Sequence, residues 1–245
     1  MTIEHGKMKT DFSPAYILHR RSYRETSLLL DVLSRDAGRI SLIAKGAKRE
    51  KSSLAGLLQP CQRLLLSWSG NGELMTLTGA EADKPFLQIG QKRLIPAFYL
   101  NELVVRLLHR HESHPELFVA YDKALAALAD ETRPEQGTIR KFEKRLLQAI
   151  GYGPVFDHDV DTGKPVESGR DYFYQADHGP VSVRPSHADF IKINGTTLIG
   201  MKEDALNTDF SLREAKRLMR YLLQKHLGDK PLASRDLYKS YMNVP

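Results

Sequence analysis

The 245-residue chain contains little cysteine and no long apolar segment. Its one cysteine, Cys61, excludes an internal disulfide framework and any metal site built from several thiolates. No apolar run is long enough to cross a bilayer, and Met1–Lys7 carries no apolar core of a secretory signal. Glycine and proline, with 17 and 12 residues, are too few for a collagen-like or low-complexity chain. We therefore expect a folded protein of the reducing cytoplasm.

Several catalytic and ligand-binding motifs are nearly present, but each one is incomplete. Gly195–Lys202 resembles a phosphate-binding loop, except that Met201 stands where the lysine must be. Asp157–Gly163 resembles the start of a calcium loop, but its glycine comes one position late and Ser168 replaces the bidentate glutamate. Cys61 has no histidine nearby in the sequence. These patterns predict no catalytic residue, no resident metal and no cofactor.

Positive charge exceeds negative charge slightly, since 36 lysines and arginines face 30 acidic residues for a net charge of +6. The excess is concentrated in three segments. Arg39–Lys51 has five cations and one acid, Phe210–Ser240 has eight cations and three acids, and Arg140–Arg145 has four cations and one acid. Each segment is either ordinary solvated surface or a binding site for a polyanion.

The first eighty residues have the pattern of short strands separated by turns. Asp36–Gly38 and Gly70–Gly72 are turn signals, and several of the apolar runs alternate as half-buried strands do. The predicted strands are residues 15–19, 27–33, 39–44, 64–68 and 73–78. Five such strands predict a small closed sheet over residues 1–82. An OB-fold barrel, a type that commonly binds single-stranded nucleic acid, fits this pattern, and an SH3-like barrel fits it nearly as well.

Residues 83–245 are predicted to form a mainly helical domain. Apolar stripes with helical spacing occur at about residues 96–108, 115–128, 139–150 and 212–227. Residues 152–185 are instead rich in glycine, aspartate and proline, with one strand-like piece at Asp171–Tyr174. The residues predict an α+β, multidomain fold class, with an N-terminal five-stranded barrel, a helical part, a small irregular region and a last helix.

Two segments, Ala15–Leu30 and Gly38–Ala47, resemble the N-terminal signature of the RecO family of bacterial recombination mediators. The resemblance continues, in the family's order, through Leu58–Pro60, Tyr99–Leu103, Arg140–Glu143, Gly151–Gly153 and Leu227–Arg235. It implies an N-terminal five-stranded OB barrel, a central helical bundle and a small irregular region, with the C-terminal helix packed on the body of the protein. Many members carry four zinc-ligating cysteines in the region after the Gly-Tyr-Gly landmark. This chain has none there, which implies a member of the zinc-less type with Asp157–Asp161 as the remnant of that loop.

The resemblance implies a non-enzymatic protein that binds single- and double-stranded DNA and anneals complementary strands. The implied partners are RecR and the C-terminal tail of the single-strand-binding protein SSB, with which it helps to load RecA onto coated DNA. We expect a monomer on its own, without a membrane partner, in the cytoplasm and at the nucleoid during repair. Two alternatives remain, a generic OB-fold RNA- or single-strand-binding protein and a metal-dependent nuclease that uses Asp157, Asp159 and Asp161.

The predicted DNA-binding residues lie on the rim of the barrel. A basic segment leaves a strand end through a small-residue turn, and such a loop can follow a phosphate backbone without reading its sequence. Its cations are Lys45, Lys48, Arg49 and Lys51. A second group adds an aromatic ring that is either a stacking platform for a base or a residue at the edge of the core. That group is Arg20, Arg21, Tyr23 and Arg24.

The third basic cluster is predicted to dock the SSB tail, which is acidic and ends in phenylalanine. Like charges four apart on a helix cost about 0.2–0.5 kcal/mol per pair, so the cluster suits an acidic ligand. The predicted docking residues are Arg140, Lys141, Phe142, Lys144 and Leu146. The resemblance favours Arg140 as the anchor for the terminal carboxylate. Alternatively, acids of neighbouring helices such as Glu116 or Asp122 neutralise a solvated basic face, and the two apolar residues belong to the core.

Overall fold

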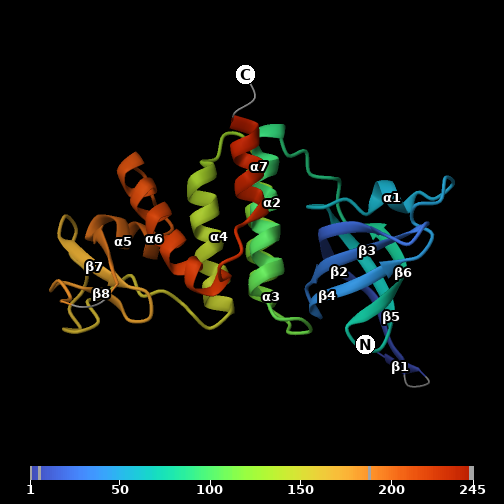
Figure 1. Ribbon diagram of the computed structural model, residues 1–245, viewed down its shortest axis with the longest axis horizontal. Coiled ribbons are helices and arrows are strands. Elements are labelled where there is room, and N and C mark those ends of the chain that lie inside the picture. Colours follow the sequence, from blue (N-terminus) through green and yellow to red (C-terminus); the bar gives the residue numbers. More distant parts are fainter. Residues whose placement is uncertain (1, 5–6, 187–188, 243–245) are drawn as a thin grey trace. The chain divides into compact units, whose positions relative to one another are not determined.

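A computed structural model of the chain describes residues 2–4, 7–186 and 189–242 (Figure 1). Its contacts divide the chain into two compact units. Unit 1 consists of Met1–Asp130 and Pro231–Pro245, and unit 2 consists of Glu131–Lys230. Each unit has its own buried apolar core. None of the helices among the described residues is long and apolar enough to span a membrane.

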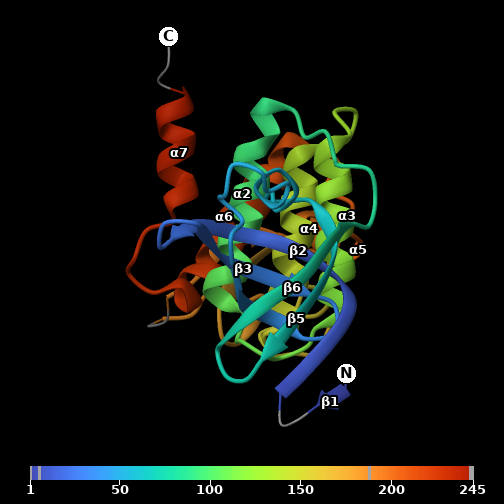
Figure 2. The ribbon, with the colours of Figure 1, turned by 90° about the vertical axis from the view of Figure 1, so that its right-hand side faces the viewer.

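Unit 1 begins with a sheet of order β1-β2-β3-β4-β6-β5 that an additional pairing between β2 and β5 closes into a barrel (Figure 2). The barrel strands are β2 (Lys7–Tyr23), β3 (Ser27–Ser34), β4 (Gly38–Ala44), β5 (Arg63–Gly70) and β6 (Leu74–Ala82). All neighbouring strands are antiparallel except β4 and β6. β1 (Thr2–Glu4) extends the sheet beside β2, and the short helix α1 (Leu54–Leu57) follows β4 in the sequence. The predicted five-stranded OB barrel is confirmed.

The barrel closes around side chains that alternate along each strand. On β3, Leu28, Leu30 and Val32 are buried while the residues between them are partly exposed, as a period of two requires. Leucines of β5 follow the same rule, and Trp68 completes the core with 1% of its surface exposed. The turn before β4 needs glycine, because Gly38 has φ +67° and a Cβ there would lie 1.8 Å from the carbonyl oxygen of Glu112.

Three helices complete unit 1, namely α2 (Gln91–Leu107), α3 (Pro115–Ala129) and α7 (Ala233–Met242). A buried polar network joins the first two to the barrel. Asn101 of α2 donates through Nδ2 to the carbonyl of Leu18 at 2.9 Å and accepts from the hydroxyl of Tyr121 on α3. The hydroxyl of Tyr16 on β2 likewise donates to Asp122. α7, which the apolar pattern did not predict, packs along α2 (Figure 1).

Unit 2 packs helices against a small sheet. Its elements are α4 (Glu135–Ala149), β7 (Asp171–Gln175), β8 (Gly179–Val181), β9 (Ile191–Asn194), α5 (Gly195–Glu203) and α6 (Asp209–Leu227). The sheet has the order β8-β7-β9, and α6 packs on both α4 and α5. The two helices expected here and the strand at Asp171–Tyr174 are confirmed. The segment that resembled a phosphate loop is helix α5, whose cap Asn194 accepts through Oδ1 from the amide of Thr196 at 3.0 Å.

Candidate functional site

The two basic groups predicted on the barrel meet at one end of it. β2 and β3 pair up to Tyr23 and Ser27, and β3 and β4 pair up to Leu28 and Ala44, so the β2–β3 turn lies beside the loop that follows β4. A hydrogen bond of 2.9 Å from the amide of Lys48 to the carbonyl of Thr26 joins the two segments directly. Residues distant in the sequence therefore form a single rim, which we call the basic rim and define as residues 20–26 and 45–52.

Main-chain turns give the basic rim its shape. Gly46 adopts φ +69°, and its carbonyl accepts from the amide of Arg49 at 3.1 Å. The carbonyl of Arg49 in turn accepts from the amide of Ser52 at 2.9 Å. Six cations of the rim are exposed, and none of them makes an ion pair with another described residue. They are Arg21, Arg24, Lys45, Lys48, Arg49 and Lys51. The rim also carries two exposed acids, Glu25 and Glu50, but its cations outnumber them, so the rim is a surface of net positive charge.

Arg20 and Tyr23 occupy less open positions on the basic rim. Arg20 is half-buried, and its Nη1 donates to the carbonyls of Ala55 at 2.8 Å and Leu58 at 3.2 Å. It therefore fastens the α1 segment to the barrel. Tyr23 is half-buried too, and the guanidinium of Arg24 lies 5.4 Å from the centre of its ring. The structure thus places all eight predicted residues at one end of the barrel, but the side chain of Arg20 is used to hold the fold together.

The third basic cluster has an acidic partner that lies far away in the sequence. The carboxylate of Asp204, the C-terminal cap of α5, pairs with Lys141 at 3.2 Å, with Arg145 at 3.4 Å and with Lys144. Burial alone would raise the pKa of Asp204, but hydrogen bonds from Lys144 and Lys141 and their charges hold it below its usual value. One carboxylate cannot neutralise three cations, so the cluster keeps a positive excess.

This arrangement corrects the choice of acidic neighbours named above. Asp122, one of the two acids considered, is in unit 1 and is engaged by Tyr16, Arg63 and Lys84. The acid that meets the cluster is Asp204 instead, because α5 ends beside α4 within unit 2. Lys144, moreover, is a buried cation. Its side chain is 5% exposed, and its Nζ donates to the carbonyl of Met201 at 2.6 Å.

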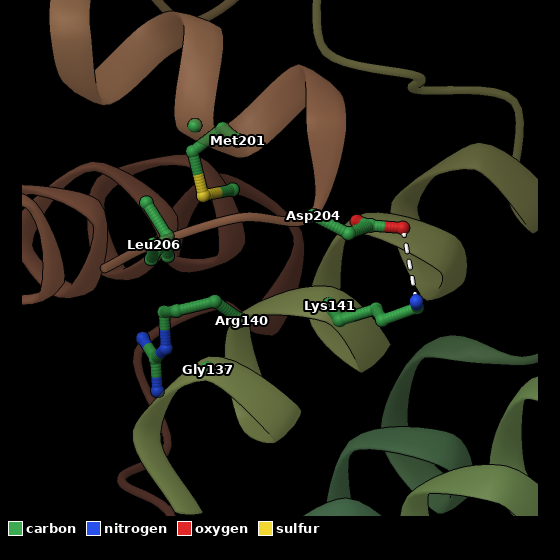
Figure 3. Close-up of a pocket in the computed structure, with 7 residues that line it drawn as sticks. Gly137, Arg140, Lys141, Met201, Asp204 and Leu206 are labelled. Atoms are coloured by element: carbon green, nitrogen blue, oxygen red, sulfur yellow. Dashed lines mark ion pairs between the residues drawn. The ribbon is translucent and has the colours of Figure 1, made fainter. Parts of the chain in front are cut away.

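A small, partly open pocket lies beside this cluster, between α4 and the end of α5 (Figure 3). Its lining residues are Gly137, Arg140, Lys141, Gly200, Met201, Asp204 and Leu206. The prediction that Phe142 and Leu146 wall an apolar slot is wrong. They are 1% and 0% exposed in the core, because they lie on the face of α4 that is packed within unit 2. Met201 and Leu206 provide the apolar lining in their place.

Arg140 is the buried cation of the pocket. Its side chain is 7% exposed, and Nη1 lies 3.0 Å from Oε2 of Glu143 one helical turn away. Its Nε has no hydrogen-bond partner among the described residues. Burial of a guanidinium donor without an acceptor costs free energy. A carboxylate is the acceptor whose geometry matches a guanidinium best. Lys141, with 54% of its side chain exposed, adds a mobile cation at the pocket mouth.

The aspartates considered for a metal site do not converge. Asp159 is 2% exposed, and its two oxygens accept from the amides of Asp161, Thr162 and Ser182 at 2.7–3.0 Å. Asp157 faces His158 at 2.7 Å, and Asp161 faces His178 at 2.8 Å. The described part of the chain contains no group of three or more side chains suited to holding a metal ion. Asp159 therefore organises the loop, and the carboxylates do not form a nuclease centre.

Sequence reasoning missed the opposite wall of the pocket. Met201 lies in the segment that resembled a phosphate loop, and Asp204 and Leu206, which follow it, belong to no recognisable motif. The only local signal is the break between two helices. At this break Asp204 has φ +58°, a left-handed conformation that aspartate tolerates better than most residues. Nothing in the sequence pairs this break with α4.

The strand order and the basic rim define a class of protein. A closed five-stranded barrel with charged loops at one end is an OB fold, and the members of this class commonly bind oligonucleotides through the strand 1–2 and 4–5 loops. In this chain the loop between the first two barrel strands is part of the basic rim.

Comparison with known proteins identifies the family. The model of the Recombination protein O N-terminal domain matches residues 2–86, and the model of its C-terminal domain matches residues 92–236. The DNA repair protein RecO of Nitrosococcus oceani is 46% identical over 230 residues, which cover 94% of this chain and 93% of that protein. RecO of Nitrosospira multiformis is 42% identical and covers 97% and 98% of the two chains. The chain belongs to the Recombination protein O family, and this relationship supports a role in DNA repair.

Proposed function

We propose that this protein binds single- and double-stranded DNA through the basic rim and anneals complementary strands as a recombination mediator. The observation that carries this proposal is the cluster of six exposed cations at one end of the OB barrel, none of which has an ion-pair partner among the described residues. Such cations bind phosphates by releasing counterions, without reading the base sequence. Sequence-blind contacts are what an annealing protein requires, because it must hold any strand.

The basic rim is tested with the variant Lys45→Ala combined with Arg49→Ala. We expect weaker binding to single strands of every sequence, measured by fluorescence anisotropy. The slope of log K against log salt should fall by about 0.7 for each lost contact, and by about 0.9 on duplex DNA. Annealing of labelled complementary oligonucleotides should slow in parallel.

The matched control removes the same charge from unit 1 at two exposed cations that already have acidic partners. These are Arg35, which pairs with Asp36 at 3.0 Å, and Lys84, which pairs with Asp122 at 3.6 Å. The proposal fails if the control and the rim variant lose affinity equally, or if the folded rim variant keeps the wild-type salt slope. Cleavage of the oligonucleotides in the presence of Mg²⁺ would favour the nuclease alternative instead.

We further propose that the pocket beside α4 receives the C-terminal tail of SSB. The tail ends in phenylalanine, so it presents an aromatic ring next to a terminal carboxylate. Met201 and Leu206 offer an apolar wall for the ring, and the guanidinium of Arg140, which lines the pocket, offers a positive charge for the carboxylate. The exposed side chain of Lys141 lies where the acidic residues of the tail would pass. In this proposal the barrel holds DNA while the pocket recruits the protein to coated strands.

The pocket is tested with Arg140→Ala combined with Lys141→Ala. Binding of a fluorescent tail peptide should fall by about tenfold or more, equivalent to about 1.4 kcal/mol. Annealing of naked DNA should persist while annealing of SSB-coated DNA fails. The control, Lys164→Ala with Arg170→Ala, removes the same charge from unit 2 at exposed residues that neither line the pocket nor pair with a residue that does.

A second variant covers the case in which removing Arg140 destabilises unit 2 by leaving Glu143 buried. Leu206→Asp places an anion in the apolar wall, where it should repel the acidic tail without disturbing that ion pair. If naked and coated DNA lose annealing together in both variants, the cluster belongs to the DNA surface and the docking proposal is wrong.

By the same family relationship we propose that the protein, a monomer on its own, acts with RecR at the nucleoid to help load RecA.

A further inference from the structure

The exposed face of α6 carries a stripe of cations that the proposed function has not used. The stripe, which we call the α6 stripe, consists of Arg213, Lys216, Arg217 and Arg220, all exposed. Spacings of three and four residues place the four side chains on one side of the helix. The buried residues of α6 face the other way, where the helix packs on α4, α5 and β9. They are Ser211, Ala215, Leu218, Met219, Leu222, Leu223 and Leu227.

Three of the four cations of the α6 stripe make no ion pair in the described structure. Glu214 lies 3.5 Å from Arg217, but its Oε2 accepts from the amide of Asn194 at 3.1 Å and from the hydroxyl of Thr197 at 2.7 Å. Asp177, near the end of α6, pairs with Lys225 at 2.5 Å. In the described structure, Arg213, Lys216 and Arg220 make no ion pair. Like charges three and four residues apart repel one another, so the stripe lowers the stability of the helix.

The dimensions of the α6 stripe suit a nucleic-acid backbone. Seven residues separate its ends, which corresponds to about 10 Å along the helix axis. A DNA strand carries one phosphate per about 3.4 Å of a duplex axis, so the stripe can meet about three consecutive phosphates. The α6 stripe and the basic rim belong to different compact units.

We infer that the α6 stripe is a second DNA-binding surface, which holds one strand while the basic rim holds another. This inference rests on the proposed function, because a second strand matters only if the rim binds the first. An annealing protein must hold two polyanions together despite their repulsion, and two separate positive surfaces achieve this better than one.

The test measures capture of a second strand by the full-length protein. Protein is bound to an immobilised oligonucleotide, and a labelled oligonucleotide that is not complementary to it is added, so that no duplex can form. In Arg213→Ala with Lys216→Ala and Arg220→Ala, retention on the first strand should stay within about twofold of wild type, while capture of the second falls by about fivefold or more. Alanine at exposed helical positions favours the helix, so the variant should fold.

The control variant removes three cations of unit 2 that already have carboxylate partners: Arg170, Lys202 and Lys225. It should capture the second strand as the wild type does. Equal capture by the stripe variant, or an equal loss in the control, would overturn the inference. Stripe-dependent binding to phosphatidylglycerol vesicles with unchanged strand capture would also overturn it, in favour of a membrane surface. A wild-type chain that does not bind the first strand would instead contradict the proposed function.

Discussion

At the scale of single residues, Asp159 has the largest organising role in unit 2. Its buried carboxylate gathers main-chain amides from its own turn and from Ser182, which lies 23 residues further along the chain. Burial opposes its charge, but the hydrogen bonds from Ser182 and Thr162 outweigh burial and lower its pKa to about 2. In a chain without the cysteines of a zinc site, one carboxylate fastens this loop.

The variant Asp159→Ala should lower the free energy of unfolding of unit 2 by about 3 kcal/mol, because it leaves three amides without their acceptor. The wild-type contribution depends on pH. A carboxyl group with a folded pKa near 2 and an unfolded pKa of about 3.9 stabilises the fold fully above about pH 5, and this contribution is lost progressively as the pH falls toward about 1. Urea unfolding at pH 7 and at steps down to pH 2.5 measures both effects.

Asp161→Ala is the matched control for this prediction. Asp161 lies two residues away and is exposed, and its Oδ1 faces only the ring of His178. Its removal should change stability by about 0.5 kcal/mol or less. An Asp159→Ala protein that unfolds at the wild-type urea concentration would show that the loop is held by other contacts.

Cys61, unlike Asp159, is buried without a charge, and its thiol is packed and unreactive. It is 2% exposed and adopts φ +63°, with its Sγ 3.4 Å from Nδ2 of Asn101. Burial raises the pKa of the Cys61 thiol to about 11, so almost no thiolate exists at neutral pH. The single cysteine therefore belongs to the junction between the barrel and α2, and a nucleophilic role does not follow from its environment.

At the scale of elements, α4 shows how one helix serves the core and a binding surface together. Its apolar residues Ile139, Phe142, Leu146 and Leu147 are buried. Its four cations would repel one another, but the C-terminal cap of α5 brings Asp204 to three of them and Glu143 pairs with the fourth. Only Lys141 and Arg145 keep substantially exposed side chains, and only Lys141 of these two lines the pocket.

At the scale of the whole molecule, the chain returns to unit 1 after unit 2 is complete. The residues that follow α6 reach α2, where the carboxylate of Glu102 accepts from the amides of Ala233 at 2.8 Å and Ser234 at 2.9 Å. The hydroxyl of Ser234 adds a third bond at 2.7 Å, and Arg106 donates to the carbonyl of Pro231 at 3.2 Å. A carboxylate at the N-terminus of α7 also meets the positive end of that helix.

Glu102→Ala should therefore loosen α7 while the barrel stays folded. Loss of a charged acceptor for two amides and a hydroxyl costs about 1.4 kcal/mol or more, so amide hydrogen exchange in α7 should become at least about tenfold faster. Mass spectrometry of peptic peptides locates the change. Glu116→Ala, at an exposed acid in the first turn of α3, is the control. Unchanged exchange in α7 would mean that its contacts with α2 hold it without Glu102.

The sequence determined whatever depends on local periodicity. Alternation over two residues predicted the barrel strands, because each strand buries one face, and stripes at helical spacing predicted α4 and α6 for the same reason. The exposure of the loop at Lys45–Lys51 followed from its density of charge, which the interior cannot accommodate unpaired. The family signature depends on these same local segments.

Only the tertiary structure decided which distant groups meet. The partner of the α4 cations is Asp204, the walls of the pocket are Met201 and Leu206, and α7 binds Glu102 of α2. These contacts join residues that are about sixty or more positions apart, and no local pattern encodes them. The fold brings such groups together by packing apolar faces against one another. An apolar face alone does not specify its partner, because many other elements could pack on it equally well. Each ion pair and pocket wall is then fixed by the geometry of that packing.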